Sequence, residues 1–145
     1  MIMSEGTLFK ASREIISALE AKGIKYTTRT AEKMSTVRVA YSGENFSSLE
    51  ISFISTDDDN DVAVRAWAYI PSVPKAKRPQ VQETVNAMNA KFRYVKFVLD
   101  EEDVNMEFDF PVRVTNVGDI ATEIISRFTN IADEAYPEFM KAMWA

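Results

Sequence analysis

The sequence predicts an α+β fold in which a single antiparallel sheet carries helices on one face. Three stretches at the start, middle and end of the chain have apolar residues at helical spacing. Between them lie shorter segments in which apolar and polar residues alternate, as in half-buried strands. The expected order is helix, four strands, helix, two strands, helix. The chain has 145 residues and no visible linker, so we expect one domain over residues 1–145.

The first helix is expected over residues 7–22. The residues that recur at helical spacing there are Leu8, Ala11, Ser12, Ile15, Ile16 and Leu19. Gly23 follows directly and is typical of the left-handed residue that ends a helix. Three strands are expected next, over residues 24–28, 36–41 and 46–55.

The fourth strand, over residues 62–70, is apolar on both faces. Strict alternation places Trp67 and Tyr69 on the face opposite Val62, Val64, Ala66, Ala68 and Ile70. A strand that is apolar on both faces is normally covered on both. We therefore expect helices over the small residues and a second subunit over Trp67 and Tyr69.

The second helix is expected to begin close to Pro79, because proline is tolerated in a first turn but not in a helix interior. Its buried face is expected to consist of Val81, Val85, Met88 and Phe92. The third helix is expected to follow Asn116 as its N-cap, with Asp119 in the first turn. Its buried stripe is expected to be Ile120, Ile124, Phe128 and Ile131, and Pro137 is expected to kink or restart it.

Residues 94–110 predict a hairpin whose register can be checked from the sequence. A turn centred on Glu101 and Glu102 sets apolar residues opposite one another, pairing Leu99 with Val104, Phe97 with Met106 and Val95 with Phe108. On the other face, the same register pairs Lys96 with Glu107 and Tyr94 with Asp109. Agreement on both faces is what cross-strand pairing favours.

Composition excludes several kinds of chemistry. The chain has no histidine and no cysteine, which excludes histidine-dependent nucleophilic catalysis, disulfides and zinc–thiolate sites. Catalysis by a carboxylate pair or by oxygen-bound Mg²⁺ is not excluded. A formal net charge of −5 disfavours nucleic acid as a partner. No signal peptide and no membrane-spanning stretch is apparent, so we expect a cytoplasmic protein without cofactors.

Two acidic turns are the candidate metal or small-anion sites. Asp57, Asp59 and Asp61 have the alternate spacing that opens an EF-hand loop, yet Val62 and Ala68 stand where that loop needs glycine and glutamate. Divalent-metal binding there is the alternative to a solvated turn that discourages aggregation. The second turn, residues 100–103, carries four adjacent carboxylates and is expected to be hydrated.

Two further clusters have simple structural interpretations. Glu107 and Asp109 share a strand face and could form a catalytic carboxylate pair, but their expected partners Lys96 and Tyr94 favour a surface charge pair. Basic residues interleaved with aromatic ones would suit nucleic-acid stacking; they are Lys75, Lys77, Arg78, Lys91, Arg93 and Lys96, with Phe92, Tyr94 and Phe97. Phe92 and Phe97 are already expected in the core, which argues against this use.

Large aromatic residues and methionines are the better candidates for function, because exposed ones often mark protein-binding surfaces. The candidates are Trp67, Tyr69, Met140, Met143 and Trp144. The alternative is that they belong to the core, with Trp144 packed back onto the sheet.

Residues 81–110 resemble the YbjN family of bacterial proteins. The resemblance rests on the run MNAKF at residues 88–92, the run FVLDEE at residues 97–102, and the tail ADEAYPEFM at residues 132–140. The first helix followed by Gly23-Ile24-Lys25-Tyr26, and Val73-Pro74 before the second helix, also fit. Residues 111–114 (PVRV) depart from the pattern, which would have an acidic or glycine-containing link there.

The resemblance implies a fold like that of the type III secretion chaperones, often dimeric, and some family members are labelled sensory transduction regulators. It supplies no catalytic residues. We therefore expect a non-enzymatic, chaperone-like protein-interaction or regulatory module that forms a homodimer and binds a further protein that the sequence does not identify.

Overall fold

A computed structural model describes residues 8–46, 48–56 and 59–144. The elements are α1 (Lys10–Ala21), β1 (Thr27–Ala31), β2 (Met34–Tyr41), β3 (Leu49–Thr56), β4 (Asp61–Ile70), the 3-10 turn η1 (Lys75–Lys77), α2 (Arg78–Lys91), β5 (Lys96–Leu99), β6 (Val104–Pro111) and α3 (Val117–Trp144). The predicted α+β class and the predicted order of elements are both confirmed.

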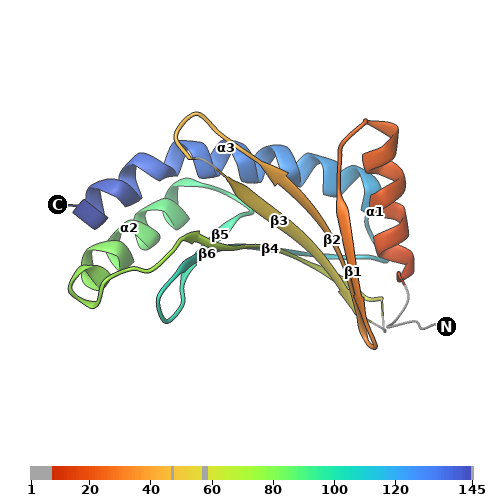
Figure 1. Cartoon of the computed structure of the whole chain (residues 1–145), viewed down its shortest axis with the longest axis horizontal. Helices are drawn as coiled ribbons and strands as arrows, with labels where there is room; N and C mark the ends of the chain where they lie inside the picture. The colour runs from red at the N-terminus through yellow and green to blue at the C-terminus, as the bar shows by residue number, and fades with distance from the viewer. Residues whose placement is uncertain (1–7, 47, 57–58, 145) are drawn as a thin grey trace.

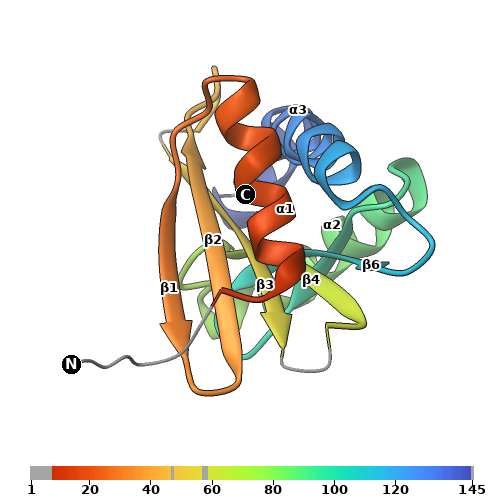
Figure 2. The same ribbon diagram turned by 90° about the vertical axis from the view of Figure 1, so that its right-hand side faces the viewer.

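The six strands form one antiparallel sheet in the order β1-β2-β3-β4-β6-β5, so β1 and β5 are its edges. The three helices lie on one face of this sheet (Figures 1 and 2). We call the opposite face, which no described element covers, the open face. The strand registers place Arg38, Ser52, Arg65, Glu107 and Lys96 in one row across it.

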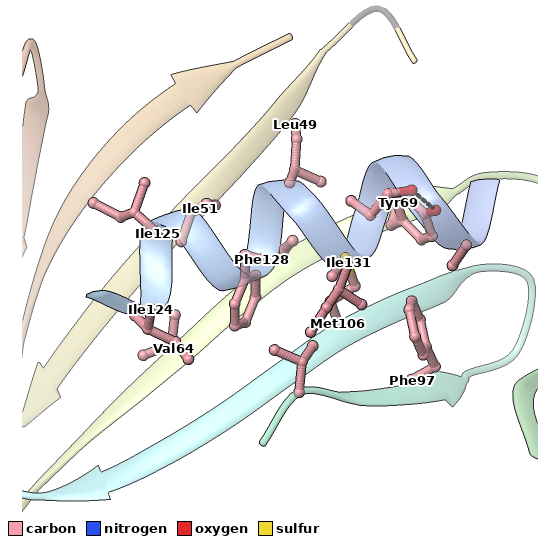
Figure 3. Close-up of a cluster of buried hydrophobic side chains, with 14 of the residues drawn as sticks. Leu49, Ile51, Val64, Tyr69, Phe97, Met106, Ile124, Ile125, Phe128 and Ile131 are labelled. Carbon is pink, nitrogen blue, oxygen red and sulfur yellow. Dashed lines mark hydrogen bonds between the residues drawn. The ribbon is translucent and has the colours of Figure 1, made fainter. Parts of the chain in front are cut away.

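The core lies between α3 and the middle of the sheet. Phe128 and its neighbours on α3 point toward Leu49 and Ile51 of β3, Val64 of β4 and Met106 of β6 (Figure 3). Burying an apolar side chain of this size contributes about 1.5–3 kcal/mol, so this contact is a large part of the stability. The predicted stripe of α3 is confirmed except at Ile120, which is only half-buried.

Two sequence predictions about α3 concern its N-cap, Asn116, and Pro137 in its second half. Asn116 Oδ1 accepts a hydrogen bond from the Asp119 N–H at 3.2 Å, which confirms Asn116 as the cap. Pro137 does not restart the helix, because α3 runs without interruption from Val117 to Trp144.

The β5–β6 hairpin has the predicted register over its inner part, with Lys96 opposite Glu107, Phe97 opposite Met106 and Leu99 opposite Val104. The outer pairs predicted for Tyr94 and Val95 are absent from the ladder, which begins at Lys96. A tight turn explains this difference. The Val95 N–H donates to the Arg93 carbonyl at 2.8 Å, and Tyr94 takes a left-handed φ of 73°.

The third strand begins at Leu49 rather than at residue 46, because Phe46 is used elsewhere. Phe46 is buried, and its ring lies 6.4 Å from that of Tyr136 on α3. The neighbouring Asn45 N–H donates to Asp133 Oδ1 of α3 at 2.8 Å. The loop between β2 and β3 is therefore fastened to α3 instead of continuing the strand.

Hydrogen bonds between polar groups hold helix α1 against the sheet. Its N-cap, Phe9, has no side-chain acceptor, so the first amides find acceptors on the sheet. The Phe9 N–H donates to Ser35 Oγ at 3.2 Å, and the Ala11 N–H donates to Asp59 Oδ1 at 3.3 Å. The buried hydroxyl of Ser12 completes the contact: its Oγ lies 2.7 Å from Ser35 Oγ and 3.2 Å from Ser55 Oγ, and both of these serines are buried too.

Replacing Asp59 with alanine should destabilise the protein by about 0.5–2 kcal/mol, because the Ala11 amide loses its acceptor. Asp59→Asn should retain most of the stability, since asparagine keeps Oδ1 and tolerates the left-handed φ of 53°. Urea unfolding measures both. Asp61→Ala, at an exposed position two residues away, is the control and should change stability by less than about 0.5 kcal/mol. Equal losses for Asp59→Ala and Asp61→Ala would contradict the capping role.

Candidate protein-interaction surface

A β-bulge in β4 shapes both faces of the sheet. The pairing of β4 with β6 loses register between Ala66 and Ile70, and Ala68 takes a left-handed φ of 53°. An alanine in this region costs roughly 1–2 kcal/mol, so the conformation needs support. Asn105 of β6 provides it: its Oδ1 accepts a hydrogen bond from the Ala68 N–H at 2.8 Å. Because Asn105 is almost fully buried, this acceptor is not competing with water.

The bulge turns Tyr69 toward the helices. Tyr69 is 8% exposed, and its hydroxyl donates to the Ala132 carbonyl of α3 at 2.5 Å (Figure 3). Its ring lies 5.8 Å from those of Phe97 and Phe139. The prediction that Tyr69 shares a face with Trp67 is therefore wrong. The bulge, in which residues 67–69 lie opposite Asn105 alone, also exposes Ala68, which was predicted to be buried.

Trp67 remains on the open face, where its side chain is 55% exposed. Arg65, two residues earlier on the same face, is held in place by β6. Its guanidinium donates to Asp109 Oδ1 at 2.8 Å and to the Phe108 carbonyl at 3.3 Å, and lies 3.9 Å from Glu107. Trp67 thus stands beside a fixed cation on a strand whose backbone is fixed by Asn105.

The carboxylates of β6 differ from their predicted pairing. Glu107 does face Lys96 across the ladder, but the ion pairs of Glu107 and Asp109 are formed with Arg65. Tyr94 instead packs against Phe108 with ring centroids 6.4 Å apart, and the Arg127 guanidinium lies 4.9 Å from the Tyr94 ring. The carboxylate pair is therefore engaged by an arginine.

The other candidate residues lie elsewhere. Met140 and Met143 are half-buried against the core, and Trp144 is 79% exposed at the end of α3. Since α3 packs on the helical side of the sheet, Trp144 does not share the open face with Trp67 (Figure 1). The five predicted residues are thus divided among the open face, the core and the end of α3.

The described residues of the first acidic turn have a structural role. Asp57 lies outside the described residues, Asp59 caps α1, and Asp61 is exposed at the start of β4. Residues 8–46, 48–56 and 59–144 contain no group of three or more side chains placed to hold a metal ion.

The second acidic turn holds the link between β4 and α2. The Ser72 N–H donates to Asp103 Oδ1 at 2.9 Å, and the Val73 N–H donates to the Glu102 carbonyl at 2.6 Å. Arg78 donates to the Glu101 carbonyl. The prediction of a merely hydrated turn therefore missed its structural role.

The basic residues do not form one patch. Lys75, Lys77 and Arg78 lie at the start of α2, whereas Lys91 and Arg93 lie at its end, roughly 20 Å away along the helix. Lys91 is also paired with Glu134 at 3.3 Å. The basic stretch seen in the sequence is thus divided between the two ends of α2.

Asn105 is the residue that the sequence interpretation missed. It lies between Val104 and Met106 in a strand, where asparagine is normally disfavoured. A buried amide at such a position indicates a specific hydrogen-bonding task, and this was the available signal.

Comparison with protein-family models gives a match over most of the chain. The family model of YbjN, described as "Putative bacterial sensory transduction regulator", matches residues 12–143. No curated protein matches the chain. Within the described ranges, no helix has both the length and the apolar character needed to cross a membrane.

Replacing Asn105 with alanine should remove the acceptor of the Ala68 amide and destabilise the protein by about 1–3 kcal/mol. Trp67 fluorescence should shift at the same time, since the bulge positions that side chain. Both are measured by urea unfolding and emission spectra in a Trp144→Phe background, which leaves Trp67 as the only tryptophan. Asn130→Ala, at an exposed position on α3, is the control. Unchanged Trp67 emission in Asn105→Ala would contradict the proposed role of the amide.

The buried phenol of Tyr69 should make stability sensitive to alkali. Burial, and secondarily the proximity of Tyr136 and Asp133, raises the pKa of Tyr69 well above its usual value of 10.0. Just above pH 10.0, only the unfolded chain releases the Tyr69 proton. The contribution of Tyr69 to the free energy of unfolding is therefore intact below that pH and falls above it by about 1.4 kcal/mol per pH unit.

Above pH 10.0, Tyr69→Phe should therefore lose pH dependence of its unfolding free energy. The slope should become shallower by the amount that corresponds to release of up to one proton on unfolding. Tyr94→Phe, which removes an exposed phenol, is the matched control. Parallel slopes for wild type and Tyr69→Phe would show that the phenol is not protected in the folded state.

Proposed function

Because the chain belongs to the YbjN family, whose members are described as regulators, we propose that it is a non-enzymatic, chaperone-like module that acts by binding protein. We propose further that its first partner is a second copy of itself, held through the open face around Trp67. The family description fixes neither the partner nor the mechanism, and both parts of the proposal rest on the geometry of that face.

The observation that carries the proposal is the exposure of Trp67 on a rigid strand. Tryptophan is the residue most enriched among those that dominate binding energy in protein interfaces. Here it is 55% exposed, and its backbone is held by the Asn105 hydrogen bond to the next residue. A side chain presented in this way loses little conformational freedom when a partner covers it.

A second copy suits the charge pattern of the open face. Arg38, Arg65 and Lys96 lie on it together with Glu50, Glu107 and Asp109, so cations and carboxylates are interspersed around Trp67. In a two-fold interface the same patch faces itself, and mixed charges allow a cation of one copy to meet a carboxylate of the other. A patch of one sign would instead repel its counterpart.

The absence of a catalytic role in this proposal follows from what the carboxylates do. Glu107 and Asp109 are engaged by Arg65, Asp59 caps α1, and Asp103 holds the link before α2. Each is used as a structural acceptor. No observation favours metal binding over these roles, so we do not propose a second function.

Trp67→Asp should convert the dimer to a monomer, because the open face would then bury an unpaired charge at its centre. Sedimentation over a range of protein concentrations should show at least about a tenfold weaker self-association than in the wild type, which corresponds to about 1.4 kcal/mol. Trp144→Asp is the matched control: it places the same charge at the other exposed tryptophan, off the open face, and should leave the dimer intact.

Two results would contradict the proposal. A wild-type protein that stays monomeric at every concentration would remove self-association altogether. Loss of the dimer in Trp144→Asp, but not in Trp67→Asp, would move the interface to the end of α3.

A further inference from the structure

The two edges of the sheet differ in how their outward backbone groups are hydrogen-bonded. At β5, the side-chain amide of Asn89 donates to the Phe97 carbonyl at 2.9 Å and accepts from the Phe97 N–H at 2.7 Å. Both outward backbone groups of Phe97 are thereby used. Where β6 extends past β5, Pro111 has no N–H, and its carbonyl accepts from the Thr115 hydroxyl at 2.6 Å. These contacts hinder the addition of a further strand at this edge.

The edge formed by β1 lacks such protection. Its five residues pair with β2 on the inner side, and no described residue forms a hydrogen bond to its outer backbone groups. The strand contains no proline, and its register with β2 is regular from Thr27 to Ala31. Three of its residues are threonines, which favour extended backbone. An edge of this kind is a template for another strand.

The surroundings of this edge are basic although the chain as a whole carries a net charge of −5. Arg29 lies at the middle of β1, Lys25 precedes the strand, and Glu32 and Lys33 form the turn that follows it, so three cations are set against one carboxylate. No described carboxylate forms an ion pair with any of the three. An incoming strand would therefore meet unneutralised positive charge.

Arg38 adds to this charge from the neighbouring strand. It lies opposite Thr27 and contacts Glu50 at a long 3.5 Å, and its Nε is buried without an acceptor. Arg38, Lys25 and Thr27 line a hollow of about 320 Å³ at the start of β1, together with Glu50 and others. Arg38 therefore adds positive charge near the start of β1, one strand in from the edge.

A second copy of this chain is a poor occupant of the edge. Two antiparallel β1 strands paired along their full length about a two-fold axis would set Arg29 directly opposite the Arg29 of the other copy. Like charges directly opposite one another are destabilising in a sheet. Charge thus favours a segment that carries carboxylates.

We propose that the outer edge of β1 receives an extended, acidic segment of a different protein as an additional strand of the sheet. Backbone hydrogen bonds would supply affinity, and carboxylates facing Arg29 and Lys25 would supply selectivity. Strands β2 and β3 lie between this edge and β4, which carries Trp67, so this inference does not depend on the dimer and can fail independently of it.

The test uses the full chain and two synthetic peptides, one alternating threonine with glutamate and one alternating threonine with lysine. The glutamate peptide should bind at least about tenfold more tightly than the lysine peptide, because like charges at the edge repel. Backbone amide shifts in NMR titrations should be largest over Thr27–Ala31, and those amides should gain protection from hydrogen exchange.

Arg29→Glu should reverse the order of affinities for the two peptides without affecting folding, since Arg29 is exposed. Lys141→Glu makes the same charge change on the exposed surface of α3 and should leave the order unchanged. Trp67→Asp should bind the glutamate peptide as the wild type does, which separates this site from the dimer surface.

Three outcomes would overturn the inference. They are no binding of the glutamate peptide at millimolar concentration, an order of affinities that Arg29→Glu leaves unchanged, and amide shifts centred on β5 or around Trp67 rather than on β1.

Discussion

The hydrogen bond from the Ala68 N–H to Asn105 Oδ1 is the constraint on which both faces of the sheet depend. It holds Ala68 at a φ of 53° within a bulge, where residues 67–69 of β4 lie opposite Asn105 alone. Before Ala68, the side chains of β4 alternate and Trp67 faces outward. After it, Tyr69 and Ile70 are both buried, and Tyr69 reaches the Ala132 carbonyl of α3. One buried amide therefore decides which aromatic residue belongs to the core and which to the surface.

This arrangement links the surface to the core energetically. The left-handed alanine costs roughly 1–2 kcal/mol, and the hydrogen bonds of Ala68 and Tyr69 return about 1 kcal/mol each. The aromatic contacts of Tyr69 with Phe97 and Phe139 add about 0.5–1.5 kcal/mol each beyond their buried area. A straightened β4 would lose these contacts and would place Tyr69 on the open face beside Trp67. The packing of α3 on the sheet thus helps to keep Tyr69 in the core.

Local pattern explains what the sequence could predict. The register of the β5–β6 hairpin followed from Phe97, Met106 and their neighbours, because both faces of a short hairpin had to agree. The start of α3 followed from Asn116, a residue that acts within its own turn. The bulge could not be predicted in the same way, since Ala68 fits an alternating strand as well as it fits a bulge. The cap of α1 was hidden for another reason: Ala11 and Asp59 are 48 positions apart, and no local pattern joins them.

The difference between the β1 and β5 edges limits how further strands could add to the sheet. Asn89 offers one donor and one acceptor on a single planar amide, which matches the outward N–H and carbonyl of Phe97. With the outward groups of Phe97 used in this way, β5 is a poorer site for strand addition than β1. If both edges were open, each added copy would present a new edge and the sheet could grow without limit. Arg29 restricts the remaining edge further, because two copies would oppose it with itself. A strand that carries carboxylates would avoid this repulsion, because its side chains would meet Arg29 with opposite charge.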